Sequence, residues 1–258
     1  MSPRRLPLSF FVVCAFAASV SAQPLRVMSY NIHHGEGLDK KLDLARIAKV
    51  ILDAKADLVG LQEVDRGVER TQKRDLPAEL AQLTGLHVAF ENNHSYQGGE
   101  YGNAILTRLP TKHVKNTHFK MLRPGEQRGV LQVVLEVNGR EVLFMNTHID
   151  YRPDDAERLM NVAELKAIVA GAGQRPVILV GDFNATPESR TITSLRAFLS
   201  DTWELVGQGA GFSIPVKKPA KRIDYVWITQ AAVEPLRIEV LRSEASDHLP
   251  VLAELRLR

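Results

Sequence analysis

The chain of 258 residues has a single cysteine, Cys14. This cysteine lies in an uncharged stretch, residues 6–20, that follows two arginines and precedes the small residue Ala22. The pattern is typical of a secretory signal peptide over residues 1–22, and the stretch is short for a membrane-spanning helix. We therefore expect a secreted or periplasmic mature chain, cleaved near Ala22. That chain would have no cysteine, which excludes disulfides and thiol catalysis in it.

Neither sign of charge dominates. The sequence has 33 Lys and Arg against 30 Asp and Glu, a formal charge of +3 that falls to about +1 without the arginines of the signal peptide. This balance gives little support for a nucleic-acid partner, which usually requires a clear basic excess. Beyond the signal peptide there is no low-complexity tract, no repeat and no change of composition that would mark a linker. A single domain over residues 23–258 is expected.

Apolar segments of strand length alternate with amphipathic segments of helical spacing. A polar loop is expected over residues 91–101, a long loop over residues 201–222, and a tight hairpin at Asn138-Gly139. The hairpin interrupts the alternation, so the pattern favours an α/β (α+β) fold of two packed mixed sheets with helices outside. Strands are predicted at 25–32, 57–64, 87–90, 102–108, 114–118, 129–137, 141–149, 176–180, 223–229, 238–241 and 250–257. Helices are predicted at 42–54, 75–83, 154–170 and 189–199.

Polar side chains stand at or near the ends of these apolar runs, where α/β folds gather catalytic groups. They supply hard oxygen ligands and two imidazoles, without a serine elbow, and so indicate metal-assisted hydrolysis of a phosphoester. Each also has an ordinary interpretation: a strand histidine with a hydrogen bond, a carboxylate that caps a turn, or an ion pair of Asp224 with Arg222. The residues are Asn31, Glu63, His148, Asp182, Asn184, Asp224, Asp247 and His248.

Seven short motifs in this order resemble the endonuclease/exonuclease/phosphatase superfamily, which has the DNase I-like fold. They are SYN (29–31), LQEV (61–64), GNAILTR (102–108), NTHID (146–150), GDFNATP (181–187), RIDYVWI (222–228) and SDHLP (246–250). The resemblance covers nearly the whole mature chain. It implies a four-layer α/β sandwich with two mixed β-sheets flanked by helices.

The resemblance also implies roles for individual residues. Glu63 would be the principal metal ligand, with Asn31 and Asp247 nearby, for Mg²⁺ or alternatively Mn²⁺. His248 would be the general base, oriented by Asp224, and Asp182 would position the water or a second metal. Asn184 and His148 would hold the phosphate. Tyr101, Asn103, Asp150 and Arg222 would contact the substrate.

The sequence leaves open the identity of the substrate and the roles of two histidines. A small or lipid-like phosphodiester is favoured, with a nuclease, an inositol or sugar phosphate monoesterase, and a non-catalytic binding module as alternatives. The basic residues Lys217, Lys218, Lys221 and Arg222 could recruit an anionic head group, but such a run is usually a solvated loop. His33 and His34 could face the substrate or belong to an ordinary loop.

Overall fold

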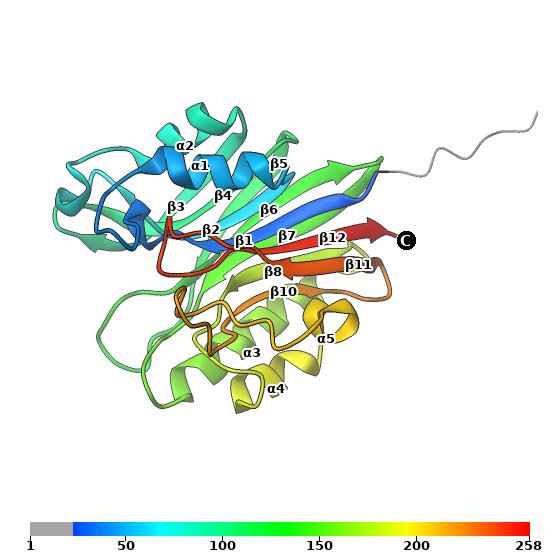
Figure 1. The fold of residues 1–258 in the computed structure, drawn as a ribbon. Helices are drawn as coiled ribbons and strands as arrows, with labels where there is room; N and C mark the ends of the chain where they lie inside the picture. The colour runs from blue at the N-terminus through cyan, green and yellow to red at the C-terminus, as the bar shows by residue number, and fades with distance from the viewer. Residues whose placement is uncertain (1–22) are drawn as a thin grey trace, which may run out of the picture.

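The computed structural model describes residues 23–258, so the predicted signal peptide lies outside the described residues. Within them, two six-stranded sheets pack face to face, and helices cover the outer face of each sheet (Figure 1). The predicted four-layer sandwich is thereby confirmed. Among residues 23–258, no helix has both the length and the apolar character needed to cross a bilayer.

Each sheet has one parallel pair of strands near its centre. The first sheet has the order β11-β12-β1-β2-β4-β3, with β1 and β2 parallel. Its strands are β1 (Leu25–Asn31), β2 (Leu58–Arg66), β3 (His87–Tyr96), β4 (Gly99–Thr107), β11 (Val233–Val240) and β12 (Val251–Leu257). The second sheet has the order β5-β6-β7-β8-β10-β9, with β7 and β8 parallel. Its strands are β5 (Thr111–His118), β6 (Gly129–Val137), β7 (Arg140–His148), β8 (Val177–Asp182), β9 (Ser200–Asp201) and β10 (Asp224–Ile228).

All the α-helices of the described residues except the third begin where a polar side chain accepts hydrogen bonds from free backbone N–H groups. Asp43 caps the first helix, Asp75 the second and Ser189 the fourth. Two helices cover the first sheet and two cover the second, and a short fifth helix follows β9. They are α1 (Leu44–Asp53), α2 (Leu76–Thr84), α3 (Ala156–Gly171), α4 (Arg190–Arg196) and α5 (Thr202–Val206), with 3₁₀ helices η1 (His33–Gly35) and η2 (Glu69–Thr71).

Three apolar clusters correspond to the three contacts between the four layers. The central cluster fills the space between the sheets and includes Val27, Phe144 and Val226. The outer clusters pack α1 and α2 on the first sheet, and α3 and α4 on the second. Alternate residues of each buried strand face opposite sides, so these strands have near-continuous apolar sequences.

A buried amide fixes the two sheets relative to each other close to their polar ends. Asn146 on β7 donates to two backbone carbonyls of the first sheet, both at 2.8 Å, and accepts from Gln62 at 2.6 Å. Gly60 lies against this contact, and a Cβ there would be 2.3 Å from the side chain of Val180. The close approach therefore requires glycine, and it brings the end of β2 next to the end of β8.

Residues 91–101 form most of a β-hairpin, so the polar loop predicted there was wrong. β3 continues to Tyr96, and the chain turns at Gln97 and Gly98, which both have positive φ (45° and 76°). β3 is an edge strand, so its side chains do not need the apolar pattern of a central strand. The loop predicted over residues 201–222 also contains α5 and the end of β9.

Candidate active site

The predicted strand-end residues come together at the end of the sandwich opposite the C-terminus (Figure 1). In the second sheet, His148 ends β7, Asp182 ends β8 and Asp224 begins β10, and the strand register places the three side by side. In the first sheet, Asn31 ends β1. Its Nδ2 donates to Asp182 Oδ2 at 3.1 Å, which joins the polar ends of the two sheets.

Several of the other site residues lie against the carboxylate of Asp182. Its Oδ2 lies 3.5 Å from His148 Nε2 and 3.8 Å from His248 Nε2, and its Oδ1 accepts from the backbone N–H of Asn184 at 2.9 Å. The side chain is 2% exposed. Burial, reinforced by the nearby Asp224, raises the pKa of Asp182 to about 7. A carboxylate with such a pKa can exchange a proton near neutral pH.

His248 is oriented by a carboxylate and a hydroxyl behind it. Its Nδ1–H donates to Asp224 Oδ2 at 2.9 Å, and the same oxygen accepts from Ser213 Oγ at 2.5 Å. Burial alone would lower the pKa of His248, but the negative charges of Asp224 and Asp182 outweigh it and raise the pKa to about 10. The imidazole therefore carries a positive charge at neutral pH, with Nε2 directed toward Asp182.

Asn184 holds His148 in place from the turn that follows β8. Asn184 has a left-handed backbone (φ 45°), which asparagine tolerates better than most residues. Its Nδ2 donates to His148 Nε2 at 3.0 Å and to the carbonyl of Ile149 at 3.2 Å. Burial and the charges of Arg128 and His248 lower the pKa of His148, so this second imidazole is neutral.

Glu63 reaches the site through an irregularity of β2. The pairing of β2 with β4 shifts register between Leu61 and Val64, and Glu63 has a left-handed backbone (φ 58°). Such a β-bulge re-aims a side chain, and strained backbone of this kind clusters at functional sites. Glu63 Oε1 accepts from Asn31 Nδ2 at 3.0 Å.

These residues fit a hard divalent cation. Carboxylate oxygens of Glu63 and Asp182 both lie within 3.1 Å of the amide nitrogen of Asn31, so oxygen donors converge on one small region. Burial and the nearby Asp224 raise the pKa of Asp182, and a cation beside it would favour its ionised form. Asp182, Asp224 and His248 also form a group whose ligand atoms all lie within 4.8 Å of one another.

A cavity of about 380 Å³ opens in front of this cluster. Sequence reasoning missed half of its wall. Arg128 immediately precedes β6 and so also stands at a strand end, a signal that would have identified it. His94 and Tyr96 belong to the hairpin that was predicted as a loop. The cavity is lined by Glu63, Arg70, His94, Tyr96, Tyr101, Glu126, Arg128, His148, Tyr151, Asp182, Asn184 and His248.

Two arginines and three tyrosines make up much of the cavity wall. Arg70 makes two hydrogen bonds to Asp65, at 2.7 and 2.8 Å, and lies over the rings of Tyr96 and Tyr101. Arg128 pairs with Glu126 at 3.0 Å, and its guanidinium is 5.5 Å from the ring of Tyr151. Both arginines are therefore held by a carboxylate and an aromatic face.

Of the predicted substrate contacts, Tyr101 lines the cavity, and two others lie behind it. Asn103 is buried in β4 and donates to the carbonyl of Gly129 at 3.3 Å. Asp150 is buried and pairs with Arg152 at 3.1 Å. The structure therefore places these two side chains where they support the wall.

Asp247, a predicted metal ligand, lies near the end of β1. The hydroxyl of its neighbour Ser246 donates to the carbonyl of Asn31 at 2.7 Å, which holds the segment against that strand. Asp247 is partly exposed and is not part of the cavity wall. His33 and His34 form η1 after β1, beside Glu63.

Arg222 is not brought to the cavity. Its Nη1 pairs with Asp201 Oδ2 at 2.6 Å, with side chains 5% and 0% exposed, and its guanidinium lies over the ring of Tyr225. The ion pair of Arg222 with Asp224 considered from the sequence was wrong, because Arg222 pairs with Asp201 and Asp224 accepts a hydrogen bond from His248. Sequence could not reveal this partner, because β9 brings Asp201 beside β10.

Replacing Arg222 with methionine is expected to destabilise the fold by about 3–5 kcal/mol, because Asp201 would remain buried without its partner. Thermal unfolding would measure the loss, and the double variant with Asp201→Asn should recover much of it. The KM of the folded variant should change less than about twofold. A tenfold rise in KM at unchanged stability would instead make Arg222 a substrate contact.

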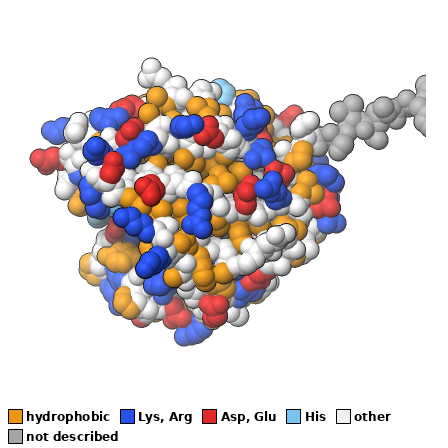
Figure 2. Space-filling view, in the orientation of Figure 1, with side chains coloured by type: hydrophobic (Ala, Val, Ile, Leu, Met, Phe, Trp, Pro, Cys, Tyr) orange, Lys and Arg blue, Asp and Glu red, His pale blue; other side chains and the backbone are white. Residues whose placement is uncertain are grey.

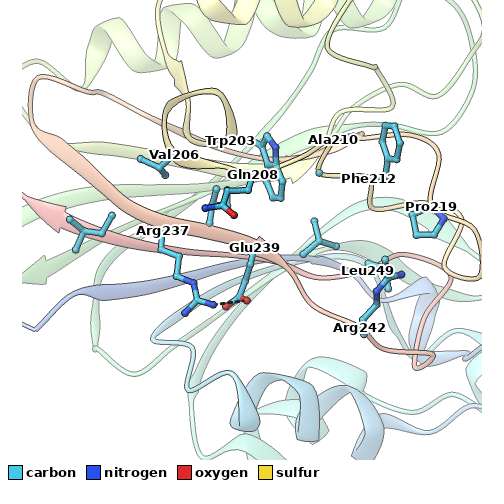
Figure 3. A pocket seen from close by; sticks show the side chains of 14 residues that line it. Trp203, Val206, Gln208, Ala210, Phe212, Pro219, Arg237, Glu239, Arg242 and Leu249 are labelled. Atoms are coloured by element: carbon cyan, nitrogen blue, oxygen red, sulfur yellow. Dashed lines mark hydrogen bonds and ion pairs between the residues drawn. The ribbon is translucent and has the colours of Figure 1, made fainter.

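A second cavity, of about 740 Å³, is larger than the one beside Asp182. It lies between the segment around α5 and the edge strand β11 and is lined by Trp203, Phe212, Pro219 and Leu249, among others (Figure 3). Arg237 and Glu239 pair across its floor at 3.0 Å. Its walls contain none of the residues that converge on Asp182, so size does not identify the active site.

The sequence is similar to known proteins over nearly its whole described length. It is 27% identical over 246 residues to the uncharacterized protein YbhP of Escherichia coli (strain K12), covering 90% of this chain and 96% of that one. It is 26% identical over 204 residues to a 5'-tyrosyl-DNA phosphodiesterase of Caenorhabditis elegans, covering 74% of this chain and 52% of that one.

The fold is equally well matched. An endonuclease/exonuclease/phosphatase from Beutenbergia cavernae superposes with a TM-score of 0.78 at 25% identity, covering 91% of this chain and 72% of that one. Residues 28–248 match the Endonuclease/Exonuclease/phosphatase family, and this range includes every residue of the cluster around Asp182. The chain therefore belongs to the Endonuclease/Exonuclease/phosphatase family.

Proposed function

We propose that the protein is a divalent-metal-dependent phosphodiesterase that hydrolyses a small phosphodiester by attack of water. Members of its family are hydrolases that act on phosphoester bonds. The observation that carries the proposal is the convergence of Asn31, His148 and His248 on one buried carboxylate, Asp182, in the wall of a cavity.

We propose Mg²⁺ as the ion, with Mn²⁺ as the alternative, held by Glu63 and Asn31 with Asp247 nearby. When bound, the ion neutralises charge that develops on the phosphoryl oxygens. The lining supports this requirement, because its positive groups, Arg70, Arg128 and His248, are each already paired with a carboxylate. Among the residues that line the cavity, an anionic ester would therefore find no unpaired positive charge without a cation.

The chain's own residues divide the proton chemistry between them. The Asp182 carboxylate lies in the cavity wall within 3.8 Å of both histidines, where it could accept the proton of the attacking water. His248, expected from sequence to be the base, has a pKa of about 10 and would instead place a positive charge beside the phosphoryl group. Asn184 and the neutral His148 provide uncharged polar groups at the same wall.

The cavity supports a small substrate over a polynucleotide. Its volume of about 380 Å³ suits one organic group of moderate size, and its tyrosines offer flat apolar faces. Arg70 and Arg128 are already paired with carboxylates, so they provide little excess positive charge for a polyanion. Basic and acidic side chains are also interspersed on the face shown in Figure 2.

Two finer expectations stay predictions. A lipid-like substrate draws no support from the relatives described above, of which the Caenorhabditis elegans enzyme is named for a tyrosyl-DNA ester. Export through the signal peptide predicted over residues 1–22 concerns residues outside those the structure describes.

Hydrolysis of bis(p-nitrophenyl) phosphate and of p-nitrophenyl phosphate by the purified protein tests the proposal. Each assay is run with Mg²⁺, with Mn²⁺ and with EDTA. We expect turnover of the diester that EDTA abolishes and either ion restores, and at least about tenfold lower kcat/KM on the monoester.

Faster turnover of the monoester would select a phosphomonoesterase acting on an inositol or sugar phosphate. Cleavage of single- or double-stranded DNA at rates above those of the small diester would select a nuclease. Metal binding without turnover of any of these esters would favour a binding module.

A further inference from the structure

A pair of histidines stands beside the proposed metal ligand Glu63 and has no part in the reaction described above. His33 and His34 follow β1 after a single residue, and their rings meet edge to face with centroids 4.4 Å apart. One ligand atom from each ring and one from Glu63 all lie within 4.8 Å of one another. This group contains two nitrogen donors and one oxygen donor, whereas the cluster around Asn31 is dominated by oxygen.

The orientation of His33 is that of a metal-binding histidine. Its Nδ1 lies 3.3 Å from the backbone carbonyl of Glu36, so Nδ1–H donates and Nε2 keeps a free lone pair. A hydrogen bond from the second ring nitrogen to a carbonyl is the usual way in which a protein sets the tautomer of a metal ligand. The backbone N–H of His33 also donates to Asn31 Oδ1 at 3.1 Å, which ties the pair to the active site.

His34 has a nitrogen that the surrounding structure leaves unused. Its Nδ1 is buried and has no hydrogen-bond partner within residues 23–258. Its Nε2 lies 3.9 Å from a carboxylate oxygen of Glu36, which is itself paired with Lys40 at 3.1 Å. A buried imidazole nitrogen without a partner is costly in a folded protein and requires an explanation.

The backbone is strained at all three residues of the group. φ is 44° at His33, 45° at His34 and 58° at Glu63, which is the left-handed region that residues with a Cβ rarely adopt. Two consecutive left-handed residues turn both imidazoles toward Glu63. Strain of this kind persists where the side-chain placement matters, and it clusters at ligand-binding positions.

We propose that His33, His34 and Glu63 form a second metal position, selective for a transition-metal ion such as Zn²⁺ over Mg²⁺. Imidazole nitrogen suits Zn²⁺ and related ions, whereas Mg²⁺ requires oxygen donors. Ligand atoms about 2.1 Å from a tetrahedral ion are roughly 3.4 Å apart, so side-chain rotations must close the observed separation by about 1.4 Å at most. Glu63 is common to this position and to the ion proposed for hydrolysis.

The test is equilibrium dialysis of the wild type and of the His33→Asn/His34→Asn variant. Each is dialysed against Zn²⁺ alone and against Mg²⁺ alone, and the bound metal is measured. Asparagine tolerates the left-handed backbone, so the fold should persist. We expect the variant to bind Zn²⁺ at least about a hundredfold more weakly and to bind Mg²⁺ within twofold of wild type. The matched control is His113→Asn, an exposed histidine of β5, which should change neither affinity.

Co²⁺ provides a second readout, because histidine nitrogen ligands change its visible absorption. The wild type should show this spectrum, and the variant should lose it. Equal Zn²⁺ affinity of wild type and variant, or an unchanged Co²⁺ spectrum, would overturn the proposal. If the double variant unfolds, His34→Gly tests the same point, because glycine adopts this backbone without strain. Neither experiment measures turnover. A negative result would therefore overturn the second metal position without bearing on the proposed phosphodiesterase activity.

Discussion

Replacing Glu63 with glutamine is expected to lower kcat/KM for phosphodiester hydrolysis by about a thousandfold. The change keeps the size of the side chain but removes the carboxylate that lies beside Asn31. Because the positive groups that line the cavity are already paired with carboxylates, weaker metal binding would also leave the anionic substrate poorly attracted. The measurement is kcat/KM across a Mg²⁺ titration, in which the residual activity should require a higher Mg²⁺ concentration.

Glu126→Gln is the matched control for this variant. Glu126 lines the same cavity but pairs with Arg128, whereas the side-chain amide of Asn31 donates to Glu63 and Asp182. Its replacement should change kcat/KM by about tenfold at most. Both variants should unfold within about 1 kcal/mol of wild type in EDTA, since both residues are partly exposed. Activity of the Glu63 variant within a few-fold of wild type would show that Glu63 is not the metal ligand.

Much of the site could be predicted because it lies on regular structure. Asn31, His148 and Asp182 each end an apolar run whose strand character is plain from sequence, and parallel strands gather their ends at one edge. The register that places Asp224 opposite Asp182 depends on pairing across the whole sheet, which local pattern does not specify. The resemblance to a known family supplied what the pattern lacked.

The other features of the site and fold could not be predicted, because they depend on tertiary contacts. The bulge that turns Glu63 into the site is a single-residue shift against β4, and no local signal marks it. The polar strand β3 is stable because β4 pairs with it, so its composition suggested a loop and concealed His94 and Tyr96. Arg222 looked like one of several solvated cations near residue 220. Its burial follows from a carboxylate 21 residues away in the chain.

Stability and activity are expected to move in opposite directions when Asp182 is replaced with asparagine. If Asp182 accepts the proton of water, kcat should fall by about 10²–10⁴-fold, because the amide cannot take that proton. Stability should rise, because burial raises the pKa of Asp182 from 3.8 to about 7, and the ionised form is therefore disfavoured in the folded protein. At neutral pH the wild type therefore loses stability through this residue.

The pH dependence of this change in stability gives a test that does not depend on turnover. The folded protein holds the Asp182 proton more tightly than the unfolded chain, so the destabilisation develops as pH rises from about 4 to about 7 and is absent below that window. The melting temperature of the Asp182→Asn variant in EDTA should exceed that of wild type at pH 7.5 and match it at pH 3.5. Asp65→Asn is the control, because the Asp65 side chain is also buried but pairs with Arg70, and its replacement should lower the melting temperature. If the Asp182→Asn variant were less stable than wild type at pH 7.5, the Asp182 carboxylate would stabilise the folded protein. It would then not be a group that lowers stability for the sake of catalysis.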